Sequence, residues 1–382
     1  MAILGKNSKD LKELNKKLIL KLICLNNQLS RIQLSKMTSL SKMTITNITS
    51  ELINDEWIEE SASQPSTTSG PKPVNLIISE KAPKLLGLAF RRKRIGVVVT
   101  SLDFKILHQK YVGYTDEDSV QDILNICYSL IDEAIEKYTI IGIGVTSPGP
   151  VDSQSGTILN PPNMGQINNI EIVKILENRY GLKVHLNKDT QGSAIAEKFW
   201  GNGKDINEFI YYSYASGIGA SIISGGILYQ PHDSYAGEVG HMSLSFNGPK
   251  CKCGNNGCLE VFCSASKLTQ EINERLNTNY SFLDCMNAYE NPKTYDIFET
   301  QINFMAISMI SLINAFNPSC IIIGDRGSEL PQPLIDKLTK KINDTIFAKQ
   351  HKYIPVIKSR FGRDSALYGS AAIVADSIFK TE

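Results

Sequence analysis

The sequence predicts a mixed α/β protein, with a winged helix-turn-helix domain in residues 1–80 and a two-lobed α/β domain in residues 85–382. Three observations predict this division. Three short amphipathic helices come first, strands then alternate with helices in two successive cycles, and residues 1–54 carry nine Lys or Arg against three Asp or Glu. A chain of 382 residues is long enough to bury the cores of two or three packing units.

Composition narrows the class of protein. Hydrophobic residues make up 42% of the chain and charged residues 21%, which excludes disordered, collagenous and coiled-coil proteins. The net charge of +1 divides into +6 for residues 1–54 and −5 for the remainder. This asymmetry indicates that only the N-terminal part meets a polyanion, with a solvated Lys-rich helix as the alternative.

The sequence carries no segment that is typical of a membrane or secreted protein. No run of 18 uncharged apolar residues occurs, and the N-terminal residues are polar and Lys-rich. We therefore expect a cytoplasmic protein without a membrane span or a signal peptide. Eight Cys in such a chain favour metal binding or buried thiols over a disulfide framework.

The N-terminal helices have the spacing and the capping residues of a helix-turn-helix. Apolar residues recur at roughly helical spacing over residues 11–25. Ser30 suits the N-cap of a short second helix, and Ser41 suits that of a third helix, which runs to Ile53. Residues 57–60 and 74–77 are strand-like and flank a loop rich in Ser, Thr, Gly and Pro, which predicts a hairpin wing.

The second member of a helix-turn-helix pair, here the third helix, lies in the DNA major groove and presents its first residues to base edges. Thr and Asn side chains can hydrogen-bond bases, while Lys and Arg reach phosphates. The residues predicted to contact double-stranded DNA are Arg31, Ser41, Lys42, Met43, Thr44, Thr46 and Asn47, together with Lys72 of the wing. A three-helix packing bundle without a ligand is the alternative.

The rest of the chain alternates strands with helices. Strands are predicted at residues 95–100, 140–146, 209–215, 220–223 and 320–323, and helices at residues 120–137, 304–315 and 332–347. Two successive α/β halves favour a two-lobed architecture with a ligand at the lobe junction. Tyr211, Tyr212 and Tyr214 recur at strand spacing and are interpreted as sheet packing rather than as a surface that stacks bases.

The sharpest local signal is a cluster of metal-ligand residue types. The predicted ligands are His241, Cys251, Cys253 and Cys258. Three thiolates and one imidazole fill all four positions of a tetrahedral zinc ion, so the site is predicted to be structural, with one zinc per chain. Buried or redox-active thiols are the alternative, and Cys263 is a nearby spare ligand.

These residues also carry a family resemblance. The stretches Gly217-Ile218-Gly219-Ala220, Ala236-Gly237-Glu238-Val239-Gly240-His241 and Cys251-x-Cys253-Gly254-x-x-Gly257-Cys258-x-Glu260 resemble the ROK family of repressors, open reading frames and sugar kinases. Pro148-Gly149, Asn317-Pro318 and Tyr368-Gly369-Ser370 extend the resemblance over residues 85–376. With its winged helix-turn-helix, the chain resembles a ROK repressor, and Phe246-Asn247-Gly248-Pro249-Lys250 is similar to xylose repressors.

The resemblance implies an actin-like, ribonuclease-H-like pair of lobes with a sugar bound in the cleft. It places the general base of the kinases on Asp189, and sugar contacts on Glu238, His241 and Glu260 as well. In this arrangement His241 uses one ring nitrogen for zinc and the other for the sugar. Carboxylates that accept hydrogen bonds from paired hydroxyls suit such a site.

Two departures from the family pattern bear on catalysis. Where the kinases have Asp-x-Gly-Gly-Thr after the first strand, this chain has Ala89-Phe90-Arg91-Arg92-Lys93-Arg94, and a later turn reads Gly324-Asp325-Arg326-Gly327. Without the Asp and both glycines, backbone amides cannot approach phosphates, and no carboxylate is left for magnesium. We therefore expect no phosphoryl transfer and regard Asp189 as a vestigial base. Arg91 to Arg94 are interpreted as a solvated charge run, with an anion, DNA or partner contact as the alternative.

The sugar side also departs from the pattern, because Lys188 and Gln191 replace the family's two Asn residues. Lys188 either pairs with Asp189 and fills the pocket, or admits an anionic ligand such as a sugar phosphate. The sequence leaves three possibilities open for the ligand of this site: a neutral sugar, a phosphorylated or otherwise different ligand, or no ligand at all.

The predicted function is a transcriptional repressor of sugar-utilisation genes. It binds operator DNA as a homodimer or homotetramer and is released by a carbohydrate, for which a xylose-like sugar is the first choice. A regulator that no sugar affects and an ATP-dependent sugar kinase are the alternatives.

Overall fold

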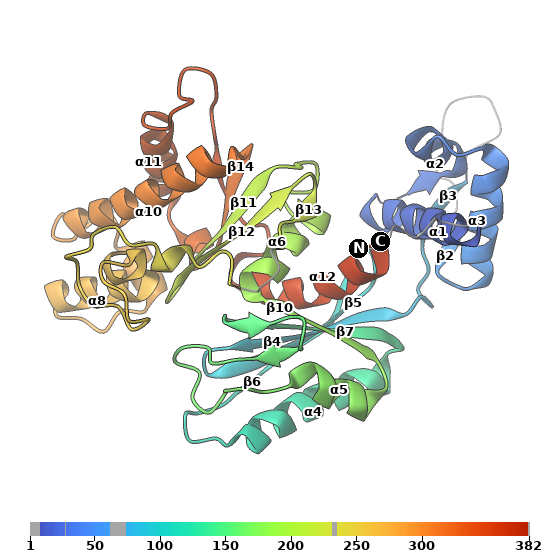
Figure 1. Ribbon diagram of the computed structural model, residues 1–382, viewed down its shortest axis with the longest axis horizontal. Helices are drawn as coiled ribbons and strands as arrows, with labels where there is room; N and C mark the ends of the chain where they lie inside the picture. Colours follow the sequence, from blue (N-terminus) through green and yellow to red (C-terminus); the bar gives the residue numbers. More distant parts are fainter. Residues whose placement is uncertain (1–7, 27, 62–73, 231–234, 381–382) are drawn as a thin grey trace.

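The computed structural model describes residues 8–26, 28–61, 74–230 and 235–380, which form an N-terminal head and two α/β lobes (Figure 1). The head lies at one end of the molecule, beside the C-terminal helix. The mixed α/β class, with an N-terminal helical region and two mixed sheets, is as predicted. No helix in these ranges is long and apolar enough to cross a membrane.

The head consists of three helices and a small sheet. Its elements are α1 (Ser8–Leu25), β1 (Leu29–Ser30), α2 (Arg31–Thr38), α3 (Lys42–Asn54), β2 (Ile58–Ser61) and β3 (Asn75–Ile78). The strands lie in the order β1-β3-β2. Both predicted N-caps are confirmed: the Ser30 hydroxyl accepts a hydrogen bond from the amide of Gln33, and the Ser41 hydroxyl accepts one from the amide of Thr44. The predicted wing tip, including Lys72, lies outside the described residues.

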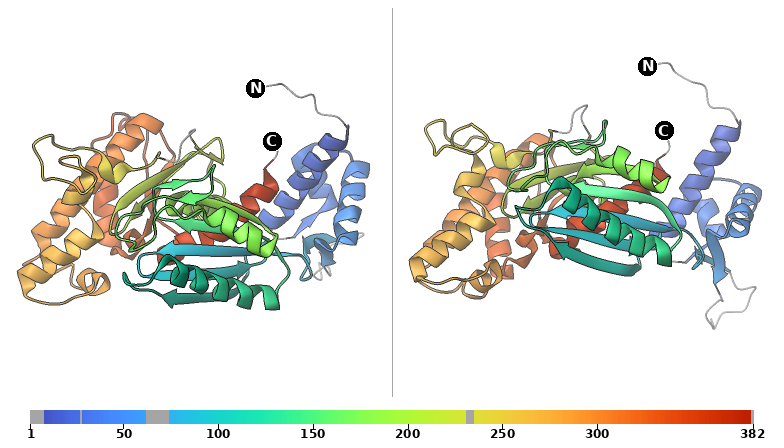
Figure 2. Two further views of the ribbon diagram at one scale, coloured as in Figure 1. Left: turned by 60° about the horizontal axis from the view of Figure 1, so that its bottom comes forward. Right: turned by 90° about the horizontal axis from the view of Figure 1, so that it is seen from below.

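The first lobe is built on a five-stranded sheet in the order β10-β7-β4-β5-β6. Its strands are β4 (Lys84–Arg91), β5 (Arg94–Thr100), β6 (Ile106–Gly113), β7 (Ile140–Ser147) and β10 (Lys183–Lys188). Helices α4 (Val120–Lys137) and α5 (Ile172–Tyr180) cover one face, where they share an apolar core with the strands (Figure 2). The small strands β8 (Val151–Asp152) and β9 (Thr157–Ile158) pair beside it.

The second lobe repeats this topology. Its sheet has the order β13-β12-β11-β14-β15, with β11 (Phe209–Tyr214), β12 (Ile218–Ser224), β13 (Ile227–Leu228), β14 (Cys320–Asp325) and β15 (Val356–Lys358). In each lobe three antiparallel strands lie in chain order, and two later strands run parallel to the first. The parallel strands of each sheet therefore end at a common edge.

Helices and short turns complete the second lobe. They are η1 (Val239–His241), α7 (Leu259–Phe262), α8 (Ala265–Leu276), α9 (Phe282–Asn287), α10 (Tyr295–Phe316), η2 (Arg326–Glu329), α11 (Gln332–Asn343) and η3 (Gly362–Asp364). Helix α10 begins well before the predicted Phe304. Helix α11 ends before the predicted Phe347, because the Asn343 side chain bonds both the amide and the carbonyl of Ile354 and so folds the chain back.

Two helices connect the lobes with the head. Helix α6 (Asp189–Trp200) crosses α12 (Ser365–Phe379), and the crossing is so close that a Cβ on Gly369 would lie 2.4 Å from the carbonyl carbon of Gly192. Buried side chains of α6 and α12 form one apolar core with side chains of α1. The head is therefore packed onto the two helices that lie between the lobes (Figure 1).

The tyrosines of β11 confirm the predicted sheet packing. Tyr211, Tyr212 and Tyr214 are buried. The hydroxyl of Tyr212 lies 2.8 Å from that of Ser308, and the hydroxyl of Tyr214 donates to Gln301. These side chains face the interior and cannot stack on bases.

Candidate effector cleft, metal cluster and DNA-binding face

The four predicted metal ligands come together in the second lobe. One ligand atom from each of His241, Cys251, Cys253 and Cys258 lies within 4.8 Å of the others. The Sγ atoms of Cys253 and Cys258 are 3.7 Å apart, and none of the described cysteines forms a disulfide. Three thiols and an imidazole at this spacing fit a tetrahedral ion such as zinc. The amide of Asn255 lowers the pKa of the Cys253 thiol, which favours the thiolate that a metal requires.

Glycines allow the loop to place these thiols. Gly254 and Gly257 have φ angles of +97° and +64°, which side chains rarely adopt. A Cβ on Gly257 would also lie only 1.9 Å from the carbonyl oxygen of Ser245. The amide of Cys251 donates to the carbonyl of Asn255, which closes the loop around the cluster.

Glu260 and His241 lie against each other beside the metal cluster. Glu260 lies in α7, directly after the last cysteine ligand, and its Oε1 is 3.5 Å from Nδ1 of His241. The same Nδ1 is 3.7 Å from Sγ of Cys251. A Cβ on Gly217 would lie 3.3 Å from Glu260 Oε2, so the Gly-rich strand start approaches this carboxylate closely. With Nδ1 facing the thiols, Nε2 is the nitrogen left for a second contact.

Asp189 begins α6 at the carboxyl edge of the first sheet. Its Oδ1 accepts a hydrogen bond of 2.7 Å from the amide of Thr190. Burial raises the pKa of Asp189 to about 6, the charge of Asp325 adds to the rise, and the charge of Arg91 opposes it. A carboxyl group with this pKa changes protonation near physiological pH and can both accept and donate to a hydroxyl.

Lys188 does not pair with Asp189, as one interpretation of the sequence had it, but with Glu238 of the other lobe. Lys188 Nζ lies 2.5 Å from Glu238 Oε1 and 3.0 Å from the carbonyl oxygen of Ala236. The side chain of Lys188 is 4% exposed and that of Glu238 is 38% exposed. Gly149 leaves room for this pair, because a Cβ there would lie 2.8 Å from Glu238 Oε1.

The basic cluster at the end of β4 is only partly solvated, and the interpretation as a solvated charge run is wrong for Arg91, which pairs within the protein. Arg91 and Arg94 pair across a tight hairpin, so no extended phosphate loop exists between β4 and β5. Arg91 Nη2 lies 2.8 Å from Asp325 Oδ1, and both side chains are mostly buried. The guanidinium of Arg94 lies 4.3 Å from the centre of the Tyr111 ring. Arg92 and Lys93, at the turn of this hairpin, are exposed as predicted, and Lys93 pairs with Asp116.

The predicted DNA contacts separate into free and engaged side chains. Lys42, Met43, Thr46 and Asn47 are exposed on one face of α3, and Met43 is 75% exposed. Of these, the Thr46 hydroxyl is engaged within the helix, since it donates to the carbonyl oxygen of Lys42 at 2.9 Å. Ser41 and Thr44 instead bond each other at the start of the helix.

Arg31 is also engaged, since it donates to Thr49 and lies 2.8 Å from Glu60 of the wing strand. Its guanidinium therefore holds the wing to α3 and is not an unengaged phosphate contact.

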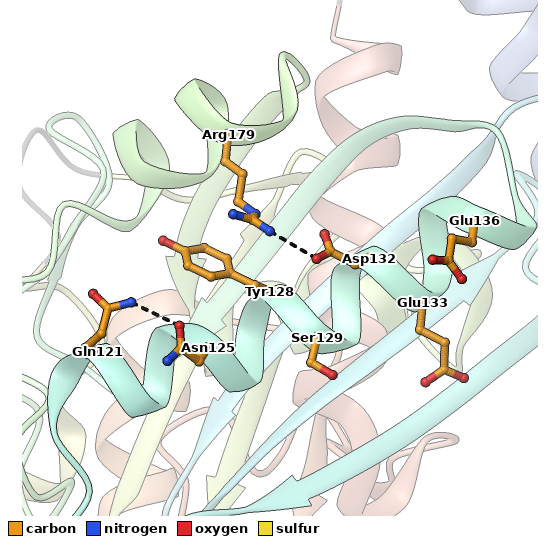
Figure 3. Close-up of a pocket in the computed structure, with 8 residues that line it drawn as sticks. All are labelled: Gln121, Asn125, Tyr128, Ser129, Asp132, Glu133, Glu136 and Arg179. Carbon is orange, nitrogen blue, oxygen red and sulfur yellow. Dashed lines mark hydrogen bonds and ion pairs between the residues drawn. The ribbon is translucent and has the colours of Figure 1, made fainter.

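Two surface hollows elsewhere give little indication of a ligand site. One lies between α4 and α5, where Arg179 pairs with Asp132 and Gln121 bonds Asn125 (Figure 3). Another lies between α10 and α11, beside Lys337, which pairs with Glu299. In both hollows these polar groups already have partners within the protein.

Sequence reasoning missed Asp325 as a site residue. The available signal was that both turns that depart from the family pattern carry charged residues, Arg91 in the first and Asp325 in the second. When two turns that depart from the family pattern carry charges of opposite sign, their charged residues are candidates for an ion pair with each other.

Comparison with known proteins agrees with these observations. Residues 86–377 match the sequence model of the ROK family. The chain is 28% identical to the xylose repressor of Caldicellulosiruptor bescii, covering 95% of this chain and 96% of that protein. It is 27% identical to the DNA-binding transcriptional dual regulator NagC of Escherichia coli strain K12, over 95% and 92% of the two chains.

Solved structures agree over the same regions. A ROK family transcriptional regulator described as a homologue of the E. coli MLC protein superposes with a TM-score of 0.82 at 26% identity, covering 97% of each chain. A ROK family glucokinase from Streptomyces griseus has a TM-score of 0.69 at 22% identity and covers 77% of this chain and 99% of its own, so it shares the fold of the two lobes. The cysteine and histidine cluster is consistent with the zinc-binding motif of these proteins. The chain belongs to the ROK family, as a transcriptional regulator that resembles the xylose repressors over its whole length.

Proposed function

We propose that this protein represses sugar-utilisation genes by binding operator DNA through α3, and that a sugar bound between the lobes releases it. One observation carries this proposal: a single helix, α6, reaches from the cleft to the head. Asp189 forms its first residue, and Phe199 and Trp200 near its end share an apolar core with Ile19 and Ile23 of α1.

This connection supports a rigid-body mechanism. A helix of 12 residues is about 18 Å long and transmits displacement without bending much. Helix α1 is held to the same unit, because Lys17 Nζ donates to the carbonyl of Lys380 at 3.0 Å. A sugar that changes lobe closure then changes the orientation of α3, and two half-sites no longer match a dimer. Coupling requires that the sugar favour the arrangement that does not bind DNA.

The charges of the cleft favour a neutral sugar as the effector. Lys188 and Arg91 already pair with Glu238 and Asp325. Among the residues proposed to contact the sugar, Asp189 and Glu260 are carboxylates and suit hydroxyls better than phosphate. Relatives named as xylose repressors and N-acetylglucosamine repressors make D-xylose and N-acetylglucosamine the first sugars to test.

Three further properties belong to this proposal. His241, Cys251, Cys253 and Cys258 would hold one structural zinc, which would order the loop that carries Glu260. The protein would act as a homodimer or homotetramer, because helix-turn-helix proteins bind paired half-sites. It would not phosphorylate sugars, because the tight hairpin between β4 and β5 lacks a phosphate loop.

A gel-shift titration on the DNA upstream of the gene, at one fixed salt concentration, tests the function. We expect specific binding, and release by one member of a panel of D-xylose, D-glucose, N-acetylglucosamine and their phosphates. Tight binding that no compound affects would indicate a regulator without an effector, and ATP-dependent sugar phosphorylation would contradict the proposal.

Variants of α3 test the DNA-binding face in the same assay. Asn47→Ala or Thr46→Ala should weaken operator binding by about 1–3 kcal/mol and leave binding to unrelated DNA unchanged, because these side chains are expected to read bases. Lys42→Ala should weaken binding to all DNA and lower the salt slope by about 1, because a phosphate contact is lost. Lys174→Ala, an exposed lysine on α5, is the matched control. Unchanged affinity in all three variants would remove α3 from the interface.

A further inference from the structure

One buried ion pair joins the two lobes at the side of the cleft where the phosphate loop has been replaced. Arg91 is the last residue of β4 and Asp325 is the last residue of β14, so their contact of 2.8 Å connects the carboxyl ends of strands in different sheets. The two side chains are 18% and 13% exposed. Water screens such a pair much less than a surface ion pair, so separating its charges opposes lobe opening.

Hydrogen bonds to their backbone carbonyls hold both Arg91 and Asp325 in place. The hydroxyl of Tyr114 donates to the carbonyl oxygen of Arg91 at 3.0 Å. Asp325 has φ +56° and ψ −133°, a conformation that residues other than glycine rarely adopt, and the hydroxyl of Ser328 donates to its carbonyl oxygen. The surrounding structure thus holds Asp325 in an unfavourable backbone conformation that aims its carboxylate at the other lobe.

The carboxylate of Asp189 is a third charge beside this ion pair, and it makes separation of the lobes possible. The negative charges of Asp325 and Asp189 both raise the pKa of Arg91, the former more strongly. Arg91 and Asp189 lie at the same edge of one sheet, whereas Asp325 belongs to the other lobe. When the lobes separate, Arg91 loses Asp325 but keeps Asp189, so the guanidinium is never left without an anion nearby.

We propose that the Arg91–Asp325 ion pair is an internal latch that holds the lobes together without a nucleotide and so sets the sensitivity of the repressor to its effector. This inference rests on the proposed function. A sugar held by Asp189 of one lobe and by Glu238 and Glu260 of the other stabilises the closed cleft, and the latch stabilises the same state. Removing the latch shifts the population toward the open form, and more sugar is then needed to release DNA.

The test uses the full chain with Arg91→Ala, Asp325→Ala and the double variant, with Lys93→Ala as the matched control from the same hairpin. The double variant removes both charges of the pair, so neither partner is left buried without the other, and the test does not depend on the folding of either single variant. Two quantities are measured for each protein: the D-xylose concentration at half-release of operator DNA, and the radius of gyration by small-angle X-ray scattering without sugar.

We expect each single variant to raise the half-release concentration about tenfold, with no further rise in the double variant, because the two residues act as one pair. The radius of gyration should increase in all three and stay unchanged in Lys93→Ala. An unchanged radius in the double variant overturns the latch. If D-xylose fails to release wild-type DNA, the choice of effector fails while the scattering result still decides whether the latch exists.

Discussion

The two sides of the cleft are each closed by an ion pair between the lobes, and the pairs differ in how they can open. On the sugar side, buried Lys188 pairs with Glu238, which is 38% exposed and can swing into solvent. On the other side, both Arg91 and Asp325 are mostly buried and fixed by neighbouring bonds. An ion pair with one exposed partner exchanges its partner for a ligand more easily than one with two buried partners.

This difference bears on the proposed function. The Lys188–Glu238 pair lies among the residues that we propose to face a sugar. The Arg91–Asp325 pair lies where the kinases are expected to have a phosphate loop. Under the two proposals, one pair would yield to a ligand while the other would restrain the lobes.

The largest expected effect comes from removing the proposed zinc, which would support only the side where we propose that the sugar binds. Cys253→Ser should reduce zinc from about one ion per chain to none and lower the unfolding midpoint by about 10 °C, because ligand binding energy is available only in the folded site. Metal analysis and calorimetry measure both quantities. Lys252→Ala, in the same loop, should change neither, and a fully stable protein without metal would refute the zinc site.

The next effect compares the two ion pairs directly. Asp325→Ala should lower the free energy of unfolding by about 3–5 kcal/mol, because it leaves Arg91 largely buried with its main partner gone. Glu238→Ala should cost about 1–2 kcal/mol, because solvent reaches that side and Lys188 keeps the carbonyl of Ala236. Urea unfolding of both variants measures which one loses more free energy of unfolding. Equal losses would show that the two ion pairs do not differ in the way described.

The last expected effect concerns pH. The folded protein raises the pKa of Asp189 from its ordinary 3.8 to about 6, so the fold favours the protonated carboxyl. The folded state then binds more protons than the unfolded state, and Asp189 makes the protein less stable as the pH rises through this window. Asp189→Asn should therefore gain stability relative to wild type between these pH values.

Asp296→Asn is the control of opposite sign, because Arg275 lowers the pKa of Asp296. Chemical unfolding at a series of pH values measures both variants. Parallel stability curves for wild type and Asp189→Asn would show that Asp189 is not perturbed.

Features that depend on neighbouring residues were predictable. The N-caps Ser30 and Ser41 act within three residues of the chain, and three metal ligands fall within eight residues. Helix α4 was predicted with its observed ends, because Ser119 caps it and its apolar stripe is regular. Such signals do not require knowledge of the tertiary fold.

Long-range pairings were not predictable in the same way. Lys188 and Glu238 are 50 residues apart, and Arg91 and Asp325 are 234 apart, so only the meeting of two sheets brings each pair together. Strand β6 was missed because it is an exposed edge strand without clear alternation. Helix α12 was missed because it is buried nearly all round and shows no polar face.

The packing of α1 has a consequence for building hybrid regulators. By its place in the chain α1 belongs to the DNA-binding head, but its buried residues Ile19, Leu20, Ile23 and Cys24 lie in the core that contains Phe199 and Phe379. A graft that exchanged the whole N-terminal segment would therefore replace one half of an interface with the body. A junction after α1 would keep that interface, but the same core contains Ile45, Ile48 and Leu52 of α3, so a new recognition helix would also need apolar residues that fit α1.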